Sequence, residues 1–259
     1  MSKHCTNVRF IQMKTKSMIA LAVALATSAA HAEEEETLPQ DPFSAQTKLG
    51  FIYTENTSSS LSYNTALILG YSKDQWEHKG GFESYYTDAD NADDGANRYT
   101  INAGSTYDYT ETSFLRAATR FENDLYGTYR KQWVLMSGLG FYLHNTDTAK
   151  LSVSLGPGYR ISERQPTDSE FPSLRNYEVI ATSTLDGSVS FSETFSVGAV
   201  MDVAHGEENT HYNTKAYVKN ILMGSLALVF DVEYIYNTTV ADDQSNDEIY
   251  STMSLSYDF

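Results

Sequence analysis

The last nine residues of the sequence, Ser251-Thr-Met-Ser-Leu-Ser-Tyr-Asp-Phe259, decide the fold. Successive side chains of a β-strand point to opposite faces, so alternate residues share a face. Leu255, Tyr257 and Phe259 therefore share one apolar face, while the opposite face carries hydroxyl and carboxyl side chains. This alternation predicts a strand with one apolar side and one polar side, and it places the C-terminus within a sheet.

The same period of two recurs from about Ala45 onwards, in twelve candidate strands. Each candidate is near the length of about 9–11 residues that a tilted strand needs to cross a bilayer. The clearest runs from Ser225 to Tyr236, where Leu, Phe, Val and Tyr alternate with a set that includes Asp231 and Glu233. The sequence also allows a count of ten, if the eighth and ninth candidates merge.

The connections between the candidate strands alternate in length. Thr110–Thr112 and Ser192–Thr194 are short, whereas Arg164–Arg175 and Asn237–Asp247 are longer and polar. A soluble sandwich shares the period of two, but alternating connections are typical of a membrane barrel with short periplasmic turns and longer external loops. Glu55–Ser59 is the one misfit, because this first external connection is short. We therefore expect an all-β, transmembrane antiparallel β-barrel of about twelve strands in the bacterial outer membrane, with both termini periplasmic.

The composition agrees with this fold. The 259-residue chain has a formal net charge of -16, which argues against nucleic acid as a partner. Its 19 tyrosines suit the aromatic girdles that a barrel places at the two membrane interfaces. The expected partners are instead outer-membrane lipid and small ions or solutes.

The N-terminal residues have the pattern of a secretory signal. Lys14 and Lys16 precede the apolar run Met18–Ala26, and Ala30 and Ala32 stand at a small-x-small cleavage site. We expect cleavage after Ala32.

This assignment divides the chain into three parts. Residues 1–32 are the expected signal peptide, residues 33–44 an acidic, disordered periplasmic leader, and residues 45–259 the barrel. The single cysteine, Cys5, lies in the signal, so the mature chain has none and needs no disulfide. Removing the signal takes the net charge from -16 to -20.

Three stretches together resemble one family, the YdiY-like, putative salt-induced outer-membrane proteins, whose domain has no assigned function. They are Ser113–Leu143, which includes Arg120-Phe-Glu-Asn-Asp-Leu-Tyr-Gly127, then Leu151-Ser-Val-Ser-Leu-Gly-Pro-Gly-Tyr-Arg160, and Ser254-Leu-Ser-Tyr-Asp-Phe259. The likeness spans nearly the whole mature chain. It departs at Glu55-Asn56-Thr57, where such proteins tend to carry Ser-Gly-Asn-Thr.

The resemblance has three implications. Leu255, Tyr257 and Phe259 look like the terminal signal that the barrel-assembly machinery recognises. The family name links the protein to salt or osmotic stress. No catalytic residue is implied.

If the apolar face meets lipid, the alternate face lines the barrel interior, and its charges are segregated. We expect a basic wall and an acidic wall to face each other across the lumen. The basic wall is Arg98, Arg116, Arg120, Arg130 and Arg160; the acidic wall is Glu178, Asp186, Asp202, Asp231 and Glu233. Other inward charges include Lys48, Glu83, Glu122 and Lys215.

Two functions follow from these walls. Facing walls of opposite charge would make a narrow passive channel that selects ions or small polar solutes. Alternatively, the charges pair and fill a closed barrel that serves a structural or surface-interaction role through its acidic external loops. A barrel of twelve strands lies between filled eight-stranded barrels and open sixteen-stranded porins, so the strand number leaves both open.

An outer-membrane hydrolase is the remote third alternative. It would need an adjacent Ser and His on the outer face, and His78 has no obvious serine near it in the sequence. His205 and His211 flank Glu207 and Glu208, but solvated loop residues explain this group more simply. We therefore expect no enzyme activity, no catalytic or metal-binding residue and no cofactor.

Overall fold

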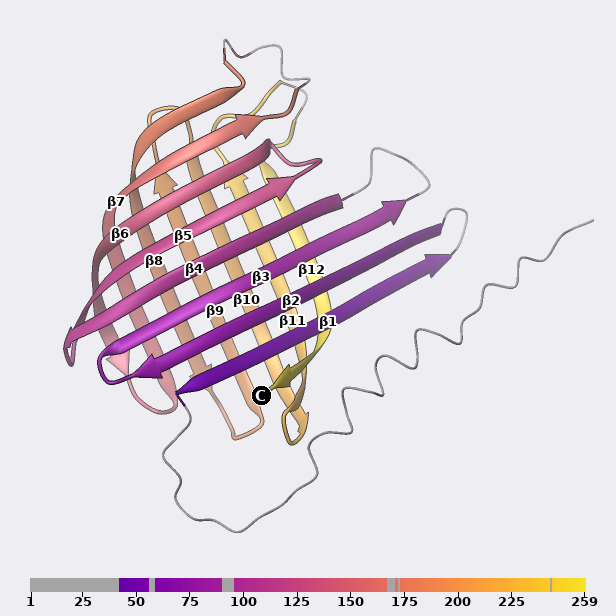
Figure 1. Ribbon diagram of the computed structural model, residues 1–259. Helices are drawn as coiled ribbons and strands as arrows, with labels where there is room; N and C mark the ends of the chain where they lie inside the picture. Colours follow the sequence, from indigo (N-terminus) through magenta and orange to yellow (C-terminus); the bar gives the residue numbers. More distant parts are fainter. Residues whose placement is uncertain (1–41, 56–58, 90–95, 167–170, 172, 243) are drawn as a thin grey trace, which may run out of the picture. The chain divides into compact units, whose positions relative to one another are not determined.

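The computed structural model describes residues 42–259, except 56–58, 90–95, 167–170, 172 and 243 (Figure 1). The expected signal peptide and nearly all of the expected leader lie outside the described residues. No helix in the described part is long and apolar enough to cross a membrane.

The described residues form twelve strands, which confirms the larger of the two strand counts. All are between 11 and 17 residues long. The strands are β1 (Phe43–Glu55), β2 (Ser59–Lys73), β3 (Trp76–Ala89), β4 (Ala96–Thr110), β5 (Ser113–Asp124), β6 (Tyr129–Asn145), β7 (Ala149–Arg164), β8 (Arg175–Ser190), β9 (Phe195–His205), β10 (Thr210–Met223), β11 (Leu226–Asn237) and β12 (Asp247–Asp258).

Each strand pairs antiparallel with its neighbours in sequence, and β1 pairs with β12, so the sheet closes into a barrel. One end carries the five short connections, such as 74–75 and 111–112, and also the start of β1 and the end of β12. We call it the short-turn end. The opposite, long-loop end carries longer connections such as 165–174 and 238–246, together with the short first connection between β1 and β2.

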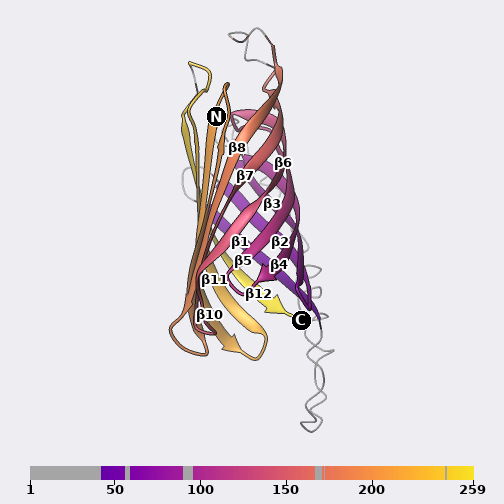
Figure 2. The same cartoon turned by 90° about the vertical axis from the view of Figure 1, so that its left-hand side faces the viewer.

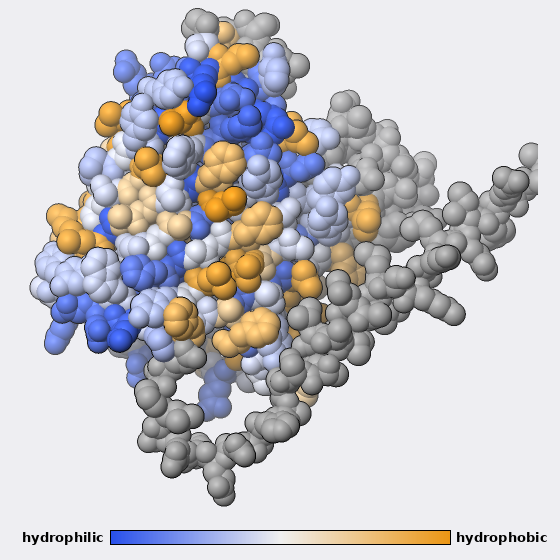
Figure 3. All heavy atoms as spheres, viewed as in Figure 1, coloured by the Kyte–Doolittle hydropathy of each residue, from blue (hydrophilic) through white to orange (hydrophobic). Residues whose placement is uncertain are grey.

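The barrel wall is apolar outside and polar inside. Directly paired residues share a face, and the row Leu49, Leu255 and Leu228 shows an apolar row crossing three strands. All three side chains are exposed. Apolar residues are also spread over the outside of the wall formed by β1–β7 (Figure 3). In contrast, most of the buried residues are polar or charged. This inversion of the soluble pattern is expected where lipid surrounds the barrel.

Aromatic rings gather near the short-turn end of β1–β4. The rings of Phe43 and Tyr71 are tilted against each other with centroids 4.8 Å apart, and the centroid of Trp76 lies 4.8 Å from that of Tyr107. Their positions at strand ends on the outer face suit one interfacial girdle.

The closure between β1 and β12 is short. Among the described residues, four pairs join β1 to β12, whereas every other neighbouring pair of strands is joined by ten to fifteen. The wall is therefore continuous around the barrel except along part of this seam.

Candidate functional site

The interior is bridged by a buried ion pair between opposite sides of the sheet. Arg98 on β4 donates from Nη1 to Glu233 Oε2 on β11 at 2.8 Å, and from Nη2 to Glu122 Oε2 on β5 at 2.7 Å. Its side chain is only 5% exposed. A guanidinium bound by two carboxylates in this way is held by charge-assisted hydrogen bonds, the strong kind.

Further charges extend this bridge into a network. Arg120 donates to Glu122 at 2.5 Å, and Lys215 contacts both Glu233, at 3.8 Å, and Glu83 on β3. We call the six residues Glu83, Arg98, Arg120, Glu122, Lys215 and Glu233 the central charge network. It links β3–β5 to β10 and β11 through the middle of the barrel.

Other contacts join the same opposite sides of the barrel, β1–β5 and β10–β12. Tyr85 on β3 lies 5.2 Å from Tyr250 on β12, with the rings edge to face, and Lys48 on β1 pairs with Asp231 on β11 at 3.0 Å. Figure 2 shows the barrel turned by 90°, with the two walls close together. Side chains therefore cross the lumen at this level.

In the structure, the five arginines of the expected basic wall lie in different surroundings. Arg98 and Arg120 join the central charge network, and Arg160 pairs with Glu178 on the adjacent strand at 2.6 Å. Arg130 donates to Asn123 Oδ1 at 2.6 Å. Arg116 also lies on an inward row, and no hydrogen bond or ion pair joins it to another described residue.

The expected acidic wall is similarly divided. Glu233 meets the basic wall across the lumen through Arg98, and Glu178 meets it along the wall through Arg160. Asp231 pairs with Lys48 instead, and Asp202 accepts a hydrogen bond from Thr184 at 2.6 Å. The structure thus brings one pair of expected partners together across the lumen, Arg98 and Glu233, and a second pair, Arg160 and Glu178, on adjacent strands.

Four residues that shape the site belong to neither expected wall. They are Lys48, Glu83, Glu122 and Lys215, all of which the alternating pattern had placed inward. Glu122 follows Arg120 by two residues on one strand, so their shared face was visible in the sequence. The other contacts join distant strands, and no local spacing reveals them.

The interior is more open towards the short-turn end. The inward Lys79 side chain is 66% exposed, in contrast to Arg98. Its row across β2–β5 continues with Gly70, Gly104 and Ala118, which occupy little space. The lumen is therefore a vestibule on this side and narrows at the central charge network.

At the long-loop end, buried arginines bind the connections to one another. Arg160 donates to the backbone carbonyls of Ala204, at 3.4 Å, and Asn209, and Asn209 donates to Asn237 Oδ1 at 2.8 Å. Arg164 lies over the ring of Phe171 at 3.4 Å. We call the connections 206–209 and 238–246, with the arginines of β7 that bind them, the loop layer.

The histidines around Glu207 and Glu208 do not form one site. His205 bonds to Thr210 Oγ1 at 2.7 Å on the outer face, whereas His211 is buried and bonds to Asn237 Oδ1 at 3.0 Å on the inner face. Within the described residues, no group of three or more His, Cys, Asp or Glu is placed to hold a metal ion.

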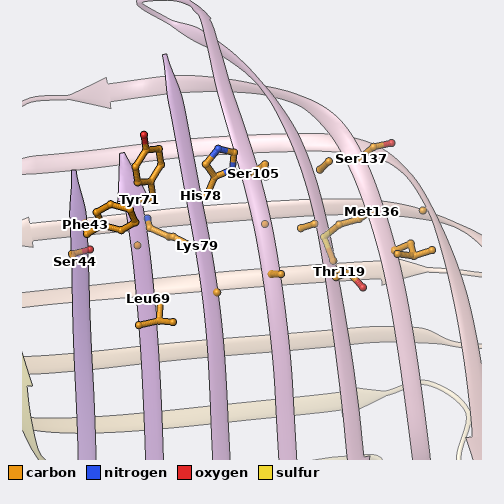
Figure 4. A pocket seen from close by; sticks show the side chains of 18 of the residues that line it. Phe43, Ser44, Leu69, Tyr71, His78, Lys79, Ser105, Thr119, Met136 and Ser137 are labelled. Atoms are coloured by element: carbon orange, nitrogen blue, oxygen red, sulfur yellow. Dashed lines mark hydrogen bonds between the residues drawn. The ribbon is translucent and has the colours of Figure 1, made fainter. Parts of the chain in front are cut away.

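The outer wall also carries a shallow groove of about 1160 Å³ that crosses β1–β7 (Figure 4). At its β3–β4 part, His78 Nδ1 lies 2.8 Å from Ser105 Oγ, and the imidazole stacks on Trp76 at 5.6 Å and on Tyr71 at 6.0 Å. The sequence shows no serine near His78, and the structure supplies one, because Ser105 comes from the neighbouring strand. Catalysis would also need an orienting group for the imidazole and oxyanion donors. Among the described side chains, Ser105 is the one polar partner of His78.

The closed antiparallel barrel, with its apolar outer face, aromatic girdle and charged interior, defines the class of protein: this is a bacterial outer-membrane β-barrel. Residues 47–259 match the family described as "Protein of unknown function, DUF481", so the chain belongs to that family. The sequence matches none of the curated proteins.

Solved structures resemble the barrel at low sequence identity. An outer-membrane channel from Pseudomonas putida F1 is 11% identical, with a TM-score of 0.51 over 88% of this chain and 99% of the channel. The KdgM porin is 11% identical, with a TM-score of 0.45 over 83% of this chain and 99% of the porin. The translocator domain of the autotransporter NalP from Neisseria meningitidis is 12% identical, with a TM-score of 0.49 over 85% and 90%. The first of these likenesses shows a common fold, and these neighbours are a channel, a porin and a translocator domain.

Proposed function

We propose that the protein is a narrow passive channel for ions and small polar solutes, in which the central charge network sets the size and selectivity of the path. The observation that carries this proposal is the Arg98–Glu233 bridge, which places both signs of charge across the polar lumen. Charged groups at a constriction select permeant ions by sign and size. The likeness to an outer-membrane channel supports the fold that this function needs.

The proposal includes an orientation. The start of β1 and the end of β12 both lie at the short-turn end, and barrels of this class place short turns in the periplasm and longer loops outside. The vestibule then opens to the periplasm, and the loop layer lies on the cell surface. A link to salt or osmotic stress belongs to this proposal too, and it rests on the family resemblance described above.

Single-channel conductance in planar bilayers tests the function. The Arg98→Ser/Glu233→Ser double variant removes one cation and one anion, so Glu122 keeps Arg120 and Lys215 keeps Glu83. We expect small discrete steps from the native protein and larger steps from the double variant, because two long side chains leave the constriction.

The matched control is Lys131→Ser/Glu163→Ser. This pair, 3.5 Å apart, is exposed and lies on the outer row next to the row of Trp133. Its removal should leave the step size unchanged. Larger steps in the control would show that the wall and not the network determines conductance.

The alternative function is a closed barrel that acts through its loops. The loop layer favours it, because buried arginines fix these connections in one arrangement. Absence of steps in both the native protein and the Arg98→Ser/Glu233→Ser variant, each folded, would establish this alternative over the channel.

A further inference from the structure

The seam between β1 and β12 is closed at one end only. Gln46–Leu49 pair with Leu255–Asp258, and Phe259 adds a hydrogen bond from its backbone N–H to the Ala45 carbonyl at 2.8 Å. Beyond Leu49, β1 pairs with β2 alone, and β12 between Asp247 and Ser254 pairs with β11 alone, throughout the described residues. Each strand therefore has a free edge in the half of the barrel nearer the long loops.

The cause of the separation lies at Gly50. A Cβ at this position would collide with the Met253 carbonyl oxygen, so β12 passes close beneath β1 here. Asn64 on β2 reaches past Gly50 and donates to Ser254 Oγ at 2.8 Å. Beyond this crossing β12 runs along the inner side of β3 and β4, where Tyr250 contacts Tyr85 and Arg98. Figure 1 shows β1 and β2 continuing away from β12.

A free edge is costly in a membrane. Hydrocarbon offers no hydrogen-bond partner, so each unpaired backbone N–H or C=O in it costs several kcal/mol. These edges therefore need polar groups beside them. Asn64 and Ser254, which bond to each other at the crossing, are two such groups.

A charged cavity lies directly behind the seam. It has a volume of about 400 Å³ and is lined by residues of β1–β4 on one side and of β9–β12 on the other, including Lys48, Asn64, Lys215, Asp231 and Tyr250. Outside the seam, Phe51 is 80% exposed and Met253 is 53% exposed. An amphiphile at this place would meet charges of both signs inside and apolar side chains outside.

We propose that the β1–β12 seam is a lateral port through which a glycerophospholipid places its charged headgroup in this cavity. Its acyl chains stay in the bilayer beside Phe51 and Met253, and the headgroup covers the free strand edges. Four residues of the central charge network, Glu83, Arg98, Lys215 and Glu233, also line this cavity, so the headgroup would lie beside the conduction path. Entry of lipid and conduction of ions are tested by different measurements.

The first test asks whether the seam is open. The chain without its first 32 residues has no cysteine, so paired cysteines report strand proximity by disulfide formation. Thr47→Cys/Tyr257→Cys joins residues that pair in the register and should oxidise readily. Tyr53→Cys/Ser251→Cys continues the same register beyond the crossing at Gly50 and Met253, into the seam, and should remain reduced. Complete oxidation of the second pair would show that β1 and β12 stay paired beyond the crossing and would overturn the proposal.

The second test asks whether lipid enters. In a Trp76→Phe/Trp133→Phe background, Tyr250→Trp places one indole in the cavity, and it keeps a ring over which Arg98 can lie. Vesicles of phosphatidylglycerol with brominated acyl chains should strongly quench this indole. The control is Tyr142→Trp, which is inward on β6 behind a wall paired on both sides.

The outcomes separate the proposals. Stronger quenching at position 250 than at position 142 supports the port, whether or not the protein conducts ions. Equal quenching at the two positions overturns it, and leaves the conductance result untouched.

Discussion

Arg98 and Glu233 lie 135 residues apart in sequence and bind each other at 2.8 Å across the barrel interior. Removing one partner of such a buried pair leaves an uncompensated charge. We predict that Arg98→Gln lowers the free energy of unfolding by about 3 kcal/mol, since both Glu122 and Glu233 lose a cation. Urea titration of the refolded protein in detergent micelles measures this change.

Arg116→Gln is the matched control for that prediction. Arg116 is inward on β5, and none of the described residues forms a hydrogen bond or ion pair with it. Its replacement should change stability by less than about 0.5 kcal/mol, as for substitutions away from specific contacts. Equal losses in the two variants would mean that the interior responds to total charge and not to the bridge.

The strands could be predicted because the pattern that specifies each strand lies within its own residues. Alternation along each segment, as in Leu226–Tyr236, fixes both the strand and the face that each side chain takes. The lengths of the connections predicted which barrel end each connection occupies. Closure was expected because an unpaired strand edge is costly in a membrane. The strand count of twelve was the expected one for these reasons.

The partners inside the barrel were not predictable in the same way. Which inward charge meets which depends on strand tilt, on the flattening of the barrel and on the path of β12, and none of these is a local property. The sequence therefore placed Lys48 and Asp231 inward without pairing them. It also separated His78 from Ser105, which become neighbours only through the register of β3 and β4.

A second prediction concerns the close approach of β6 and β7. A Cβ at Gly156 would collide with the Ser137 carbonyl oxygen, so this position requires glycine for space. Gly156→Ala should destabilise the barrel by about 1–3 kcal/mol, the usual cost of overpacking. Gly80→Ala serves as control, because the nearest heavy atom to a Cβ there is 4.0 Å away. The urea midpoint should fall for the first variant alone; unchanged midpoints for both would show that the two strands can move apart freely.

A third prediction concerns the loop layer. Arg160 is 1% exposed and donates at once to Glu178, Ala204 and Asn209, a geometry that a planar guanidinium can serve and a lysine ammonium cannot. Arg160→Lys should therefore free the connection 206–209 and speed its cleavage at Glu207 and Glu208 by a glutamate-specific protease.

Arg175→Lys is the control for this effect. Arg175 is exposed and lies over the ring of Tyr177 at 5.3 Å, outside the loop layer. Cleavage between residues 206 and 209 should keep its native rate in this variant. If Arg160→Lys is cleaved no faster than Arg175→Lys, the protection of the connection 206–209 does not depend on the hydrogen bonds of the Arg160 guanidinium.

The last prediction tests the orientation of the barrel, on which the roles of the vestibule and the loop layer depend. Glu111 lies in the short connection between β4 and β5, and Glu207 lies between β9 and β10 at the opposite end; both are exposed. In intact cells, a maleimide too large to cross the outer membrane should label Glu207→Cys and leave Glu111→Cys unlabelled. After the cells are lysed, both variants should react, which shows that each cysteine is accessible in itself. Labelling of Glu111→Cys alone in intact cells would show that the barrel has the opposite orientation. The open vestibule would then face the surroundings, and the buried arginines would face the periplasm.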